Sequence, residues 1–467
     1  MDQNMTMGKK VRSALLNNIV TMVFIAFAVV GYIFSGDFTP SSFINEIAVR
    51  FFRNSLLIIS LIIPVIAGLG LNFGIVVGAL VGMLSTIIVR YNMLAGHLSS
   101  PIGSLMLCFL IALPMAILVG LLIGRLYNKT RGQEMIASLM VGFFAEGIYM
   151  IILLFVIGGI IPVTRGHPMI NPTSGVGIRS SFDMGLPASE INLARGAHQV
   201  PGMSRALTGL WRVEFIHALI AVAAVALAIV IIRYLMTKKR PEISQGSPWQ
   251  FYLRAALYGA ILVFGIVQAI APMREVRNLL PIPAVTLLVI CGFCLFNTYF
   301  LRTKLGQDCR SVGQSQSIAN AAGINVDRTR IIATVISTVF AAWGMIVYLQ
   351  DMGTVSAYTA QRQIGMFAVA ALLVGGATAA KASAKNAIIG LILFHSMFIV
   401  SPGIGRLLPI ASENAENVGE YIRSFMMYAV IGVSLGLHVW KINKAAKDKA
   451  KLDPKAVAEA NAAAEIP

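Results

Sequence analysis

Charged residues are scarce in this chain, and their scarcity excludes a water-soluble protein. Only 12% of the 467 residues are Asp, Glu, Lys or Arg, whereas 57% are hydrophobic. A soluble globular domain carries about 25% charged residues, so half that share leaves too little polar surface to cover a core in water. We therefore expect an integral membrane protein, with a lipid bilayer as the solvent for most of its surface.

Cysteine is also rare, and its placement excludes a disulfide framework. Of the four cysteines, Cys108, Cys291 and Cys294 lie in apolar runs, and Cys309 lies in a basic segment. Cys291 and Cys294 form a CxxC motif, but in such apolar surroundings we interpret the pair as packing inside a membrane helix. No His, Cys, Asp and Glu residues have the spacing of a metal site, so no metal is expected.

The chain lacks the GxxxxGK[ST] motif, whose backbone amides hold nucleotide phosphates. We therefore expect no cofactor and no ATP hydrolysis by the chain itself, so any such energy must come from a partner. No nucleophile or acid–base constellation predicts an enzyme. The formal net charge is +17, but the basic residues form short clusters between apolar runs. Because no basic face is interleaved with aromatic residues, we do not expect nucleic acid binding.

Apolar runs long enough to cross a membrane occur along most of the chain. A helix needs about 20 mostly apolar residues to cross the bilayer, so the sequence predicts an all-α, polytopic membrane helix bundle of about 10–12 transmembrane helices. We place the spans near 15–35, 54–71, 73–89, 103–124, 135–160, 215–236, 253–270, 283–301, 331–350, 364–379, 386–402 and 421–440.

The lysines predict the orientation of these spans. Every lysine falls in one of six segments, which are 1–14, 125–133, 237–252, 302–330, 380–385 and 441–467. Under the positive-inside rule these segments and both termini are cytoplasmic. The arginines follow the rule less closely, and Arg50, Arg53, Arg274 and Arg277 are among those that fall on the outer side. No small-residue cleavage site follows the first span, so it is expected to be an uncleaved anchor.

These assignments predict one transmembrane domain over residues 1–440. It contains two long connections, an outer insertion at 161–214 that is rich in Gly, Pro and Ser, and an inner loop at 302–330. A polar cytoplasmic tail follows at 441–467, with no chemistry assigned to it.

Two glycine-interrupted segments are the first candidates for a translocation path. Asn72, Gly74 and Gly78 lie in the first, and the small residues four apart share a helix face and let neighbouring helices approach closely. One interpretation is helix packing alone, and the other is a broken helix beside the path, with Asn72 in mid-membrane. Gly375 and Gly376 mark the second segment, and paired interrupted segments in two halves are typical of a transporter.

Glu146 is the most unusual residue inside a predicted span. A carboxylate at mid-membrane costs roughly 2.5–3.5 kcal/mol, so it must face the protein interior, a wet cavity or a partner. A place on the path and a neutral structural role both remain open for Glu146. We interpret His395 and Asn297, which are also polar and within spans, as helix-packing residues.

The inner loop carries the most specific pattern of the sequence, RTKLGQDCRSVGQSQSIANAAGINVDRTR. It resembles the cytoplasmic loop of ABC importer permeases of the sugar, nucleoside and branched-chain amino acid superfamily. Their pattern runs T-x-x-G-x-x-x-R-A-V-G, then A-A-x-x-x-G-I-N, then a basic residue. The matching residues are Thr303, Gly306, Arg310, Val312, Gly313, Ala319, Gly323, Ile324 and Asn325, followed by Arg328 and Arg330.

The resemblance covers most of 54–440. The segment RGQEMIASLMVGFF at 131–144 is more similar to nucleoside-type members than to sugar-type ones. The stretch after Gly376 lacks the family's further glycines, and the outer insertion and the tail make the chain longer than usual. The superfamily is therefore indicated, and the solute remains open among nucleosides, simple sugars and branched-chain amino acids.

The resemblance implies a permease without catalysis of its own, in a bacterial inner membrane. Its partners would be an ABC ATPase subunit, a second permease subunit (the same or related) and an extracytoplasmic solute-binding protein. A short helix around 314–322 would dock into the ATPase, with Gly323 as its C-terminal cap. The residues expected to couple the permease to the ATPase are Arg310, Gly313, Ala319, Ala322, Gly323, Ile324 and Asn325.

Two other classes fit parts of the sequence. A self-contained secondary transporter also has about a dozen spans and paired broken helices. A membrane scaffold without transport is the third possibility. The inner loop favours the ABC permease over both.

Overall fold

The computed structural model describes most of the chain between residues 19 and 440. The described residues are 19–36, 38–94, 97–98, 100–162, 167–171, 176–185, 202–239, 248–378, 381–407, 418, 420–433, 436 and 440. The predicted tail at 441–467 and the middle of the predicted outer insertion therefore lie outside the described residues.

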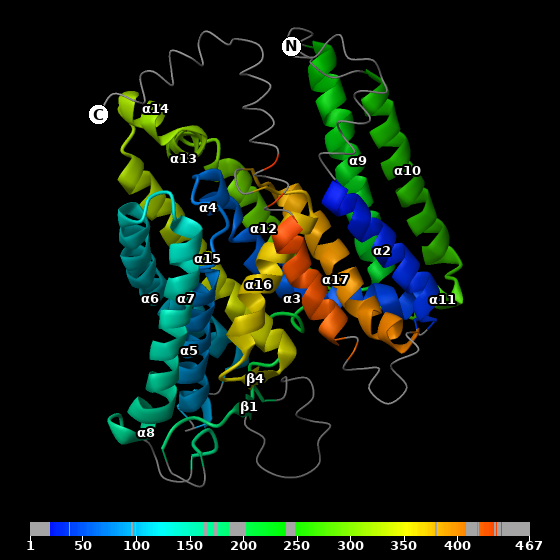
Figure 1. Ribbon diagram of the computed structural model, residues 1–467. Helices are drawn as coiled ribbons and strands as arrows, with labels where there is room; N and C mark the ends of the chain where they lie inside the picture. Colours follow the sequence, from blue (N-terminus) through cyan, green and yellow to red (C-terminus); the bar gives the residue numbers. More distant parts are fainter. Residues whose placement is uncertain are drawn as a thin grey trace.

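The fold is a polytopic bundle of membrane helices, as the sequence predicts (Figure 1). Within the described residues, eight helical stretches are long and apolar enough to cross a membrane, and each overlaps a predicted span. They are α3–α4 (Pro40–Ile59 and Ile62–Ile66), α5 (Ile75–Leu94), α6 (Pro101–Lys129), α7–α8 (Glu134–Ile151 and Ile157–Gly159, joined by the π-helical turn Ile152–Val156), α9 (Phe215–Lys239), α10 (Pro248–Ile270), α15 (Val326–Met352) and α17 (Ala384–Leu407).

Three further apolar helices fill the remaining predicted spans up to residue 407. They are α2 (Ile19–Ser35), α12 (Ala284–Phe300) and α16 (Ala360–Val374). Helix α12 forms a bent pair with α13 (Lys304–Gln314), and the axes of the two meet at 73°. The last predicted span, 421–440, is helical in its described stretch 420–433. The short helices α11 (Arg274–Arg277) and α14 (Gln316–Ala321) lie in connections.

Helix α15 forms the centre of the bundle because glycines on its neighbours let backbones approach it. A Cβ atom on Gly78 of α5 would lie 2.6 Å from the Cβ of Ala341 and 2.7 Å from the carbonyl oxygen of Thr338. Gly120 of α6 would likewise place a Cβ 2.9 Å from the Cα of Val335. Any larger residue at these positions would push the helices apart. Gly78 therefore serves the close packing of α5 on α15, which is one of the two interpretations of this glycine.

The loops separate into two groups at opposite ends of the bundle (Figure 1). At one end, α13 and α14 lie beside the turn between α6 and α7, where Asn128 donates a hydrogen bond to the carbonyl oxygen of Asp327 at 3.0 Å. We call this the loop end. The segments 125–133 and 302–330, both predicted to be cytoplasmic, therefore lie at the same end of the bundle. That this end is cytoplasmic stays a prediction.

The opposite end carries the only strands among the described residues. Strand β1 (Ser181–Asp183) pairs antiparallel with β4 (Thr354–Ser356), and β2 (Arg212–Val213) pairs antiparallel with β3 (Ile282–Pro283). Both pairs tie the predicted outer insertion to segments that follow α15 and α10. The described strands of the insertion are therefore held at this end, which is the predicted outer side and is called the outer end below.

The predicted span at 54–71 begins and ends earlier than expected. The helix begins at Pro40, where Thr39 caps it by accepting a hydrogen bond from the Ser42 amide. It ends at Ile66, and residues 67–74 form a non-helical turn before α5. Asn72 and Gly74 thus lie in the turn between two spans, whereas Gly78 lies in α5.

Candidate functional site

The 67–74 turn is buried although it contains no helix or strand. Ala67, Leu69, Leu71 and Phe73 are at most 5% exposed. Gly68 and Gly70 have φ angles of 76° and 66°, a region that only glycine adopts readily. A buried irregular segment must find partners for its backbone polar groups, so its surroundings show what holds it.

Asn72 organises the turn through its side-chain oxygen. Its Oδ1 accepts hydrogen bonds from the Gly74 amide at 3.0 Å and from the hydroxyl of Tyr127 on α6 at 2.9 Å. The next amide, that of Phe73, donates to the hydroxyl oxygen of Ser138 on α7 at 3.1 Å. A Cβ on Gly74 would lie 2.4 Å from the Tyr127 hydroxyl, so glycine is required there.

Asn72 lies nearer the loop end than the broken-helix interpretation, with Asn72 in mid-membrane, would place it. Its partner Tyr127 is in the last turn of α6 and accepts a hydrogen bond at its carbonyl oxygen from Arg330, in the second turn of α15. Helix α15 has 27 residues and is therefore about 40 Å long. Asn72 is thus level with the first quarter of that helix.

The 302–330 loop lies directly on this turn. Gly313, near the end of α13, is so close that a Cβ on it would lie 2.0 Å from the carbonyl oxygen of Ile66. In the other direction, a Cβ on Gly68 would lie 2.9 Å from the Cα of Gly313. The two backbones therefore touch without intervening side chains. A displacement of α13 would therefore be passed directly to the turn.

A buried ion pair makes the second link between the loop and the bundle. Arg330 is completely buried and pairs with Glu134, the first residue of α7. The guanidinium also donates to the carbonyl oxygen of Tyr127 at 3.2 Å and to the side-chain oxygen of Gln316, on α14, at 3.4 Å. A buried charge is tolerated only when paired in this way. Arg330 thereby joins α14, α6 and α7.

Sequence reasoning did not single out the pairing of Arg330 with Glu134. In the sequence, Arg330 belongs to the basic residues that end the loop pattern, and Glu134 belongs to the nucleoside-type segment. A carboxylate and a guanidinium at the ends of two apolar spans were the available signal. Since 196 residues separate them, spacing alone could not pair them.

The local structure of the loop follows from three caps. Ser315 caps α14 by accepting from the Ile318 amide, and Asn325 caps α15 by accepting from the Arg328 amide at 2.9 Å. Gly323 has a φ of 79°, and the Ile324 amide beside it donates to the carbonyl oxygen of Ala319 at 3.0 Å. This is the αL ending that the sequence predicts for Gly323. Helix α14 is shorter than predicted, ending at Ala321.

The predicted coupling residues divide into two faces. Ala319 is 1% exposed and packs with Val312 of α13 and Val326 of α15. It therefore holds α14 against these two helices and cannot belong to an outward docking surface. In contrast Ile318 is 71% exposed, an unusual position for isoleucine next to water. Exposed on the same side are Ser317, Asn320, Ala321, Ala322 and Gly323.

A pocket of about 750 Å³ lies between α14 and the turn that joins α6 to α7. Its lining includes Gly323, Ile324 and Asn325, and an ion pair between Arg131 and Asp327 closes one side. Three predicted coupling residues therefore share one concave surface.

Glu146 occupies a different level of the bundle. It is half-buried on α7, and Gln361 of α16 donates a hydrogen bond to it at 3.4 Å. The Gln361 side chain is completely buried, so this contact places two polar groups inside the bundle. Nearby, Gly365 of α16 packs on Val76 of α5. Glu146 thus faces the protein interior, one of the positions expected for an intramembrane carboxylate.

Gly375 and Gly376 end α16. A Cβ on Gly375 would lie 1.9 Å from the carbonyl oxygen of Asn386, and Asn386 donates from Nδ2 to the Gly375 carbonyl oxygen at 2.7 Å. Gly376 has a φ of 85° and turns the chain. The closest neighbours of Gly375 are on α17, so the structure uses this segment for a tight crossing of α16 and α17.

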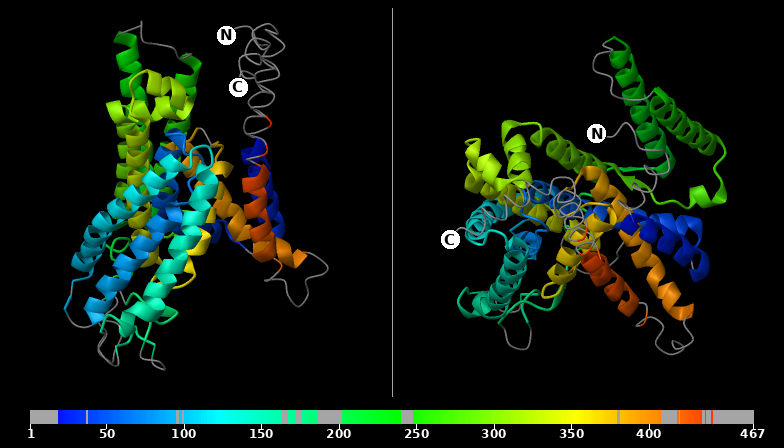
Figure 2. Two further views of the ribbon diagram at one scale, coloured as in Figure 1. Left: turned by 60° about the vertical axis from the view of Figure 1, so that its left-hand side comes forward. Right: turned by 45° about the horizontal axis from the view of Figure 1, so that its top comes forward.

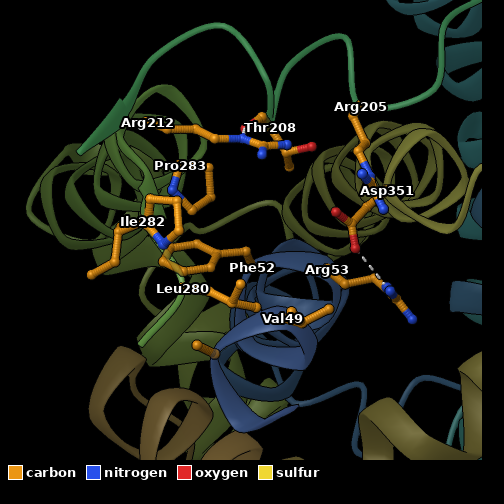
Figure 3. Close-up of a pocket in the computed structure, with 12 residues that line it drawn as sticks. Val49, Phe52, Arg53, Arg205, Thr208, Arg212, Leu280, Ile282, Pro283 and Asp351 are labelled. Carbon is orange, nitrogen blue, oxygen red and sulfur yellow. Dashed lines mark hydrogen bonds and ion pairs between the residues drawn. The ribbon is translucent and has the colours of Figure 1, made fainter. Parts of the chain in front are cut away.

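The outer end contains a basic pocket of about 210 Å³ (Figure 3). Arg53 of α3 forms an ion pair with Asp351 at 2.8 Å, and Arg205 points toward the same carboxylate. Arg212 donates to the carbonyl oxygen of Thr208 at 3.3 Å. Three arginines and one aspartate give the lining a net positive charge.

A comparison with known families decides the class of the protein. A family model for the permease component of the branched-chain amino acid transport system matches residues 43–431. The chain belongs to this permease family. It is therefore a multi-pass membrane subunit of the ABC transporter class, a channel component and not a catalytic one. No curated protein and no solved structure matches the chain.

The matched region contains both links described above. It begins within α3, covers the 67–74 turn and the 302–330 loop, and ends in the last described helical stretch. The region in which the 302–330 loop contacts the helices thus lies entirely within the part of the chain that matches the permease family.

Proposed function

We propose that this permease imports a small polar solute through a bacterial inner membrane, driven by a separate ATPase bound to its 302–330 loop. A nucleoside or a simple sugar is the favoured solute, and a branched-chain amino acid is the remaining choice. The observation that carries the proposal is the backbone contact between Gly313 and Gly68. It gives an ATPase that grips the loop a direct mechanical route to the membrane helices.

The ATPase would grip the exposed face of α14 and the adjacent pocket. Ile318 supplies an apolar anchor, and the small Ala321 and Ala322 allow close approach. Motion of α14 would pass through α13 to the 67–74 turn, and through Arg330 to α6 and α7. Because packed interfaces move between discrete arrangements, a small shift at the loop can rock whole helices.

The favoured solute follows from the 131–144 segment and from the polar groups within the bundle. Glu146 and Gln361 offer hydrogen-bond acceptors and donors suited to hydroxyl and amide groups. The glutamate of the nucleoside-type segment, Glu134, pairs with Arg330, so part of that resemblance reflects the structure of the loop end.

Two more partners complete the proposed assembly. A second permease subunit, identical or related, would line a common path with this one. A solute-binding protein would dock at the outer end, where the basic pocket around Arg53, Arg205 and Arg212 suits acidic side chains.

The decisive experiment uses the full chain with an affinity tag in its native host. We expect a P-loop ATPase and a solute-binding protein to co-purify with it, and solute uptake into proteoliposomes to require that ATPase and ATP. Ion-driven uptake by the purified chain alone would overturn the proposal in favour of a secondary transporter. Absence of uptake with every co-purified partner would favour a scaffold.

Gly323→Phe tests the loop itself. A bulky residue in the αL cap should leave the bundle folded but reduce ATP-driven uptake at least tenfold, while ATP hydrolysis by the complex continues. Gly36→Phe, at another glycine with a positive φ and open space but outside the loop, is the control. Unchanged uptake by Gly323→Phe would contradict the docking surface.

A further inference from the structure

A second basic pocket, of about 500 Å³, lies at the loop end between α12, α13 and the turn after α16. Three cations from three different segments line it. Arg302 follows α12, Arg310 is on α13, and Lys381 precedes α17. We call it the inner basic pocket.

The inner basic pocket has no internal counter-charge. Among its described lining residues there is no aspartate or glutamate. Within the part of the chain that the structure describes, Arg302, Arg310 and Lys381 form no ion pair and no side-chain hydrogen bond. Three like charges in one concave site repel one another and attract an anion. The outer basic pocket differs, because Asp351 neutralises part of its charge.

A buried polar atom in the lining indicates a ligand that also donates hydrogen bonds. Asn297 lines the pocket and is 2% exposed. Its Nδ2 donates to the carbonyl oxygen of Ile59, but its Oδ1 has no partner among the described residues. An unsatisfied buried acceptor costs roughly 1–3 kcal/mol, so a hydroxyl of the ligand would relieve it.

The surroundings of the pocket are those of a lipid site. It lies where α12 ends and α13 turns away by 73°. Just before this bend, Leu295 is 69% and Tyr299 is 75% exposed, which offers an apolar surface that continues into the membrane. Tyrosine is enriched at the level of the head groups. Basic pockets between membrane helices on the cytoplasmic side bind anionic lipid head groups.

We propose that the inner basic pocket binds the head group of an anionic phospholipid from the cytoplasmic leaflet. The phosphodiester lies among Arg302, Arg310 and Lys381, a head-group hydroxyl donates to Asn297, and an acyl chain runs along Leu295 and Tyr299. The bound lipid joins α13 to the turn before α17. The proposal rests on the predicted orientation, in which the loop end faces the cytoplasm. It does not depend on the proposed ATPase or on the identity of the solute.

Lipid binding is tested on the full chain, purified and delipidated in a neutral detergent, by native mass spectrometry. We expect phosphatidylglycerol to bind at least tenfold more tightly than phosphatidylcholine with the same acyl chains. Glycerol 3-phosphate, which has the phosphate without the acyl chains, should not compete at equal concentration. Equal binding of the two lipids would overturn the proposal, as would full competition by glycerol 3-phosphate.

Charge removal locates the site. A near-surface cation contributes about 1 kcal/mol to binding of an anionic lipid, so Lys381→Gln should weaken binding about fivefold and the triple variant R302Q/R310Q/K381Q about a hundredfold. The matched control is the triple variant R125Q/K129Q/K304Q, which removes three exposed cations from the same end outside the pocket. Equal losses in the two triple variants would mean general attraction to a basic surface and would reject the pocket.

Asn297→Leu tests the hydroxyl contact. The wild-type chain should prefer phosphatidylglycerol over phosphatidylmethanol, which has the same charge but no head-group hydroxyl, by about fivefold. The variant should bind both lipids equally, with a native melting temperature as the check on folding. A preference that persists in Asn297→Leu would reject the assigned role of Asn297.

Discussion

Two regions of the molecule, both apolar enough to cross a membrane, differ strongly in burial. In the central helices α5 and α15, 72% and 67% of the membrane-spanning stretch is buried inside the protein. In the hairpin formed by α9 and α10 the corresponding shares are 11% and 12%. Figure 2 shows α9 and α10 standing beside the other helices, in contact mainly with each other.

The difference shows that hydropathy identifies a membrane-spanning helix but does not tell whether its side chains face lipid or protein. The hairpin is apolar because its side chains face lipid, whereas the central helices carry glycine, serine, threonine and even arginine because they face protein. Lipid is as apolar as leucine, so it gives no reason for helices to associate. Close packing and buried polar contacts must supply that reason, and they are concentrated around α15.

The largest expected difference in stability is between removing a buried ion pair and removing an exposed one. Arg330→Met leaves Glu134 without its partner, and breaking a buried pair costs about 3–5 kcal/mol. The control Arg131→Met removes an exposed pair with Asp327, whose loss should cost less than about 1 kcal/mol. Urea unfolding of the two purified variants in detergent measures both values. The double change of Arg330→Met with Glu134→Leu should recover most of the loss, and equal losses in the two single variants would refute the contrast.

The next largest difference is expected between a glycine substitution in the central helices and one in the α9–α10 hairpin. Gly78→Ala drives a Cβ into Ala341 and should destabilise the protein by about 1–3 kcal/mol, as overpacking does elsewhere. Gly259→Ala, on α10, meets no atom within 4 Å and should be neutral or slightly stabilising. Melting temperatures of the two variants provide the measurement. A similar fall in both would mean that the hairpin is packed as tightly as the centre.

Removing one hydroxyl should have a smaller effect. Tyr127→Phe deletes the hydrogen bond to Asn72 and should cost about 1 kcal/mol. Tyr234→Phe on α9 keeps the ring that stacks on Phe251 at 4.5 Å and should change little. Amide hydrogen exchange should show faster opening of residues 67–74 in Tyr127→Phe only. Unchanged exchange there would show that Asn72 does not depend on Tyr127.

The smallest effect concerns pH at the outer end. His167 is buried against the ring of Tyr91, and burial, with Arg90 nearby, lowers the pKa of its imidazole below the ordinary 6.5. A group with a lowered pKa in the folded state stabilises the fold fully above its unfolded pKa, and the contribution is lost as pH falls from about 6.5 through the folded pKa. The melting temperature should therefore fall on acidification below about pH 6.5.

Substitution of the histidine tests this cause. His167→Asn should reduce the acid sensitivity of the melting temperature. An identical pH profile for wild type and His167→Asn would remove His167 as the cause.

The sequence predicted correctly those features that depend only on residues close together in the chain. A run of about 20 apolar residues must cross the membrane wherever it lies, so the positions of the spans followed directly. Gly323 needed a positive φ for a helix end within its own loop, and its role as a cap was also predictable. The start of α3 was missed because Arg50 and Arg53 make its first half polar. The Thr39–Pro40 pair, a common helix start, was the signal for it.

Positions that depend on distant segments could not be obtained in this way. Ala319 was expected on the docking face, yet it packs against Val312 and Val326. One of the two interpretations of Asn72 places it in mid-membrane, yet Tyr127 holds it near the loop end. In both cases the deciding neighbour comes from another helix, and the spacing of residues along the chain carries no information about it.

The sequence by itself thus determined that this is a polytopic helical membrane protein, and its inner loop indicated the permease family. Both follow from hydropathy and from short patterns, which act over one helix or one loop. Only the tertiary structure decided that Gly313 touches Gly68, that Arg330 meets Glu134 and that three separate cations share one pocket. Such contacts arise from how the helices pack, because close packing and buried charge are satisfied between segments that lie far apart in the chain.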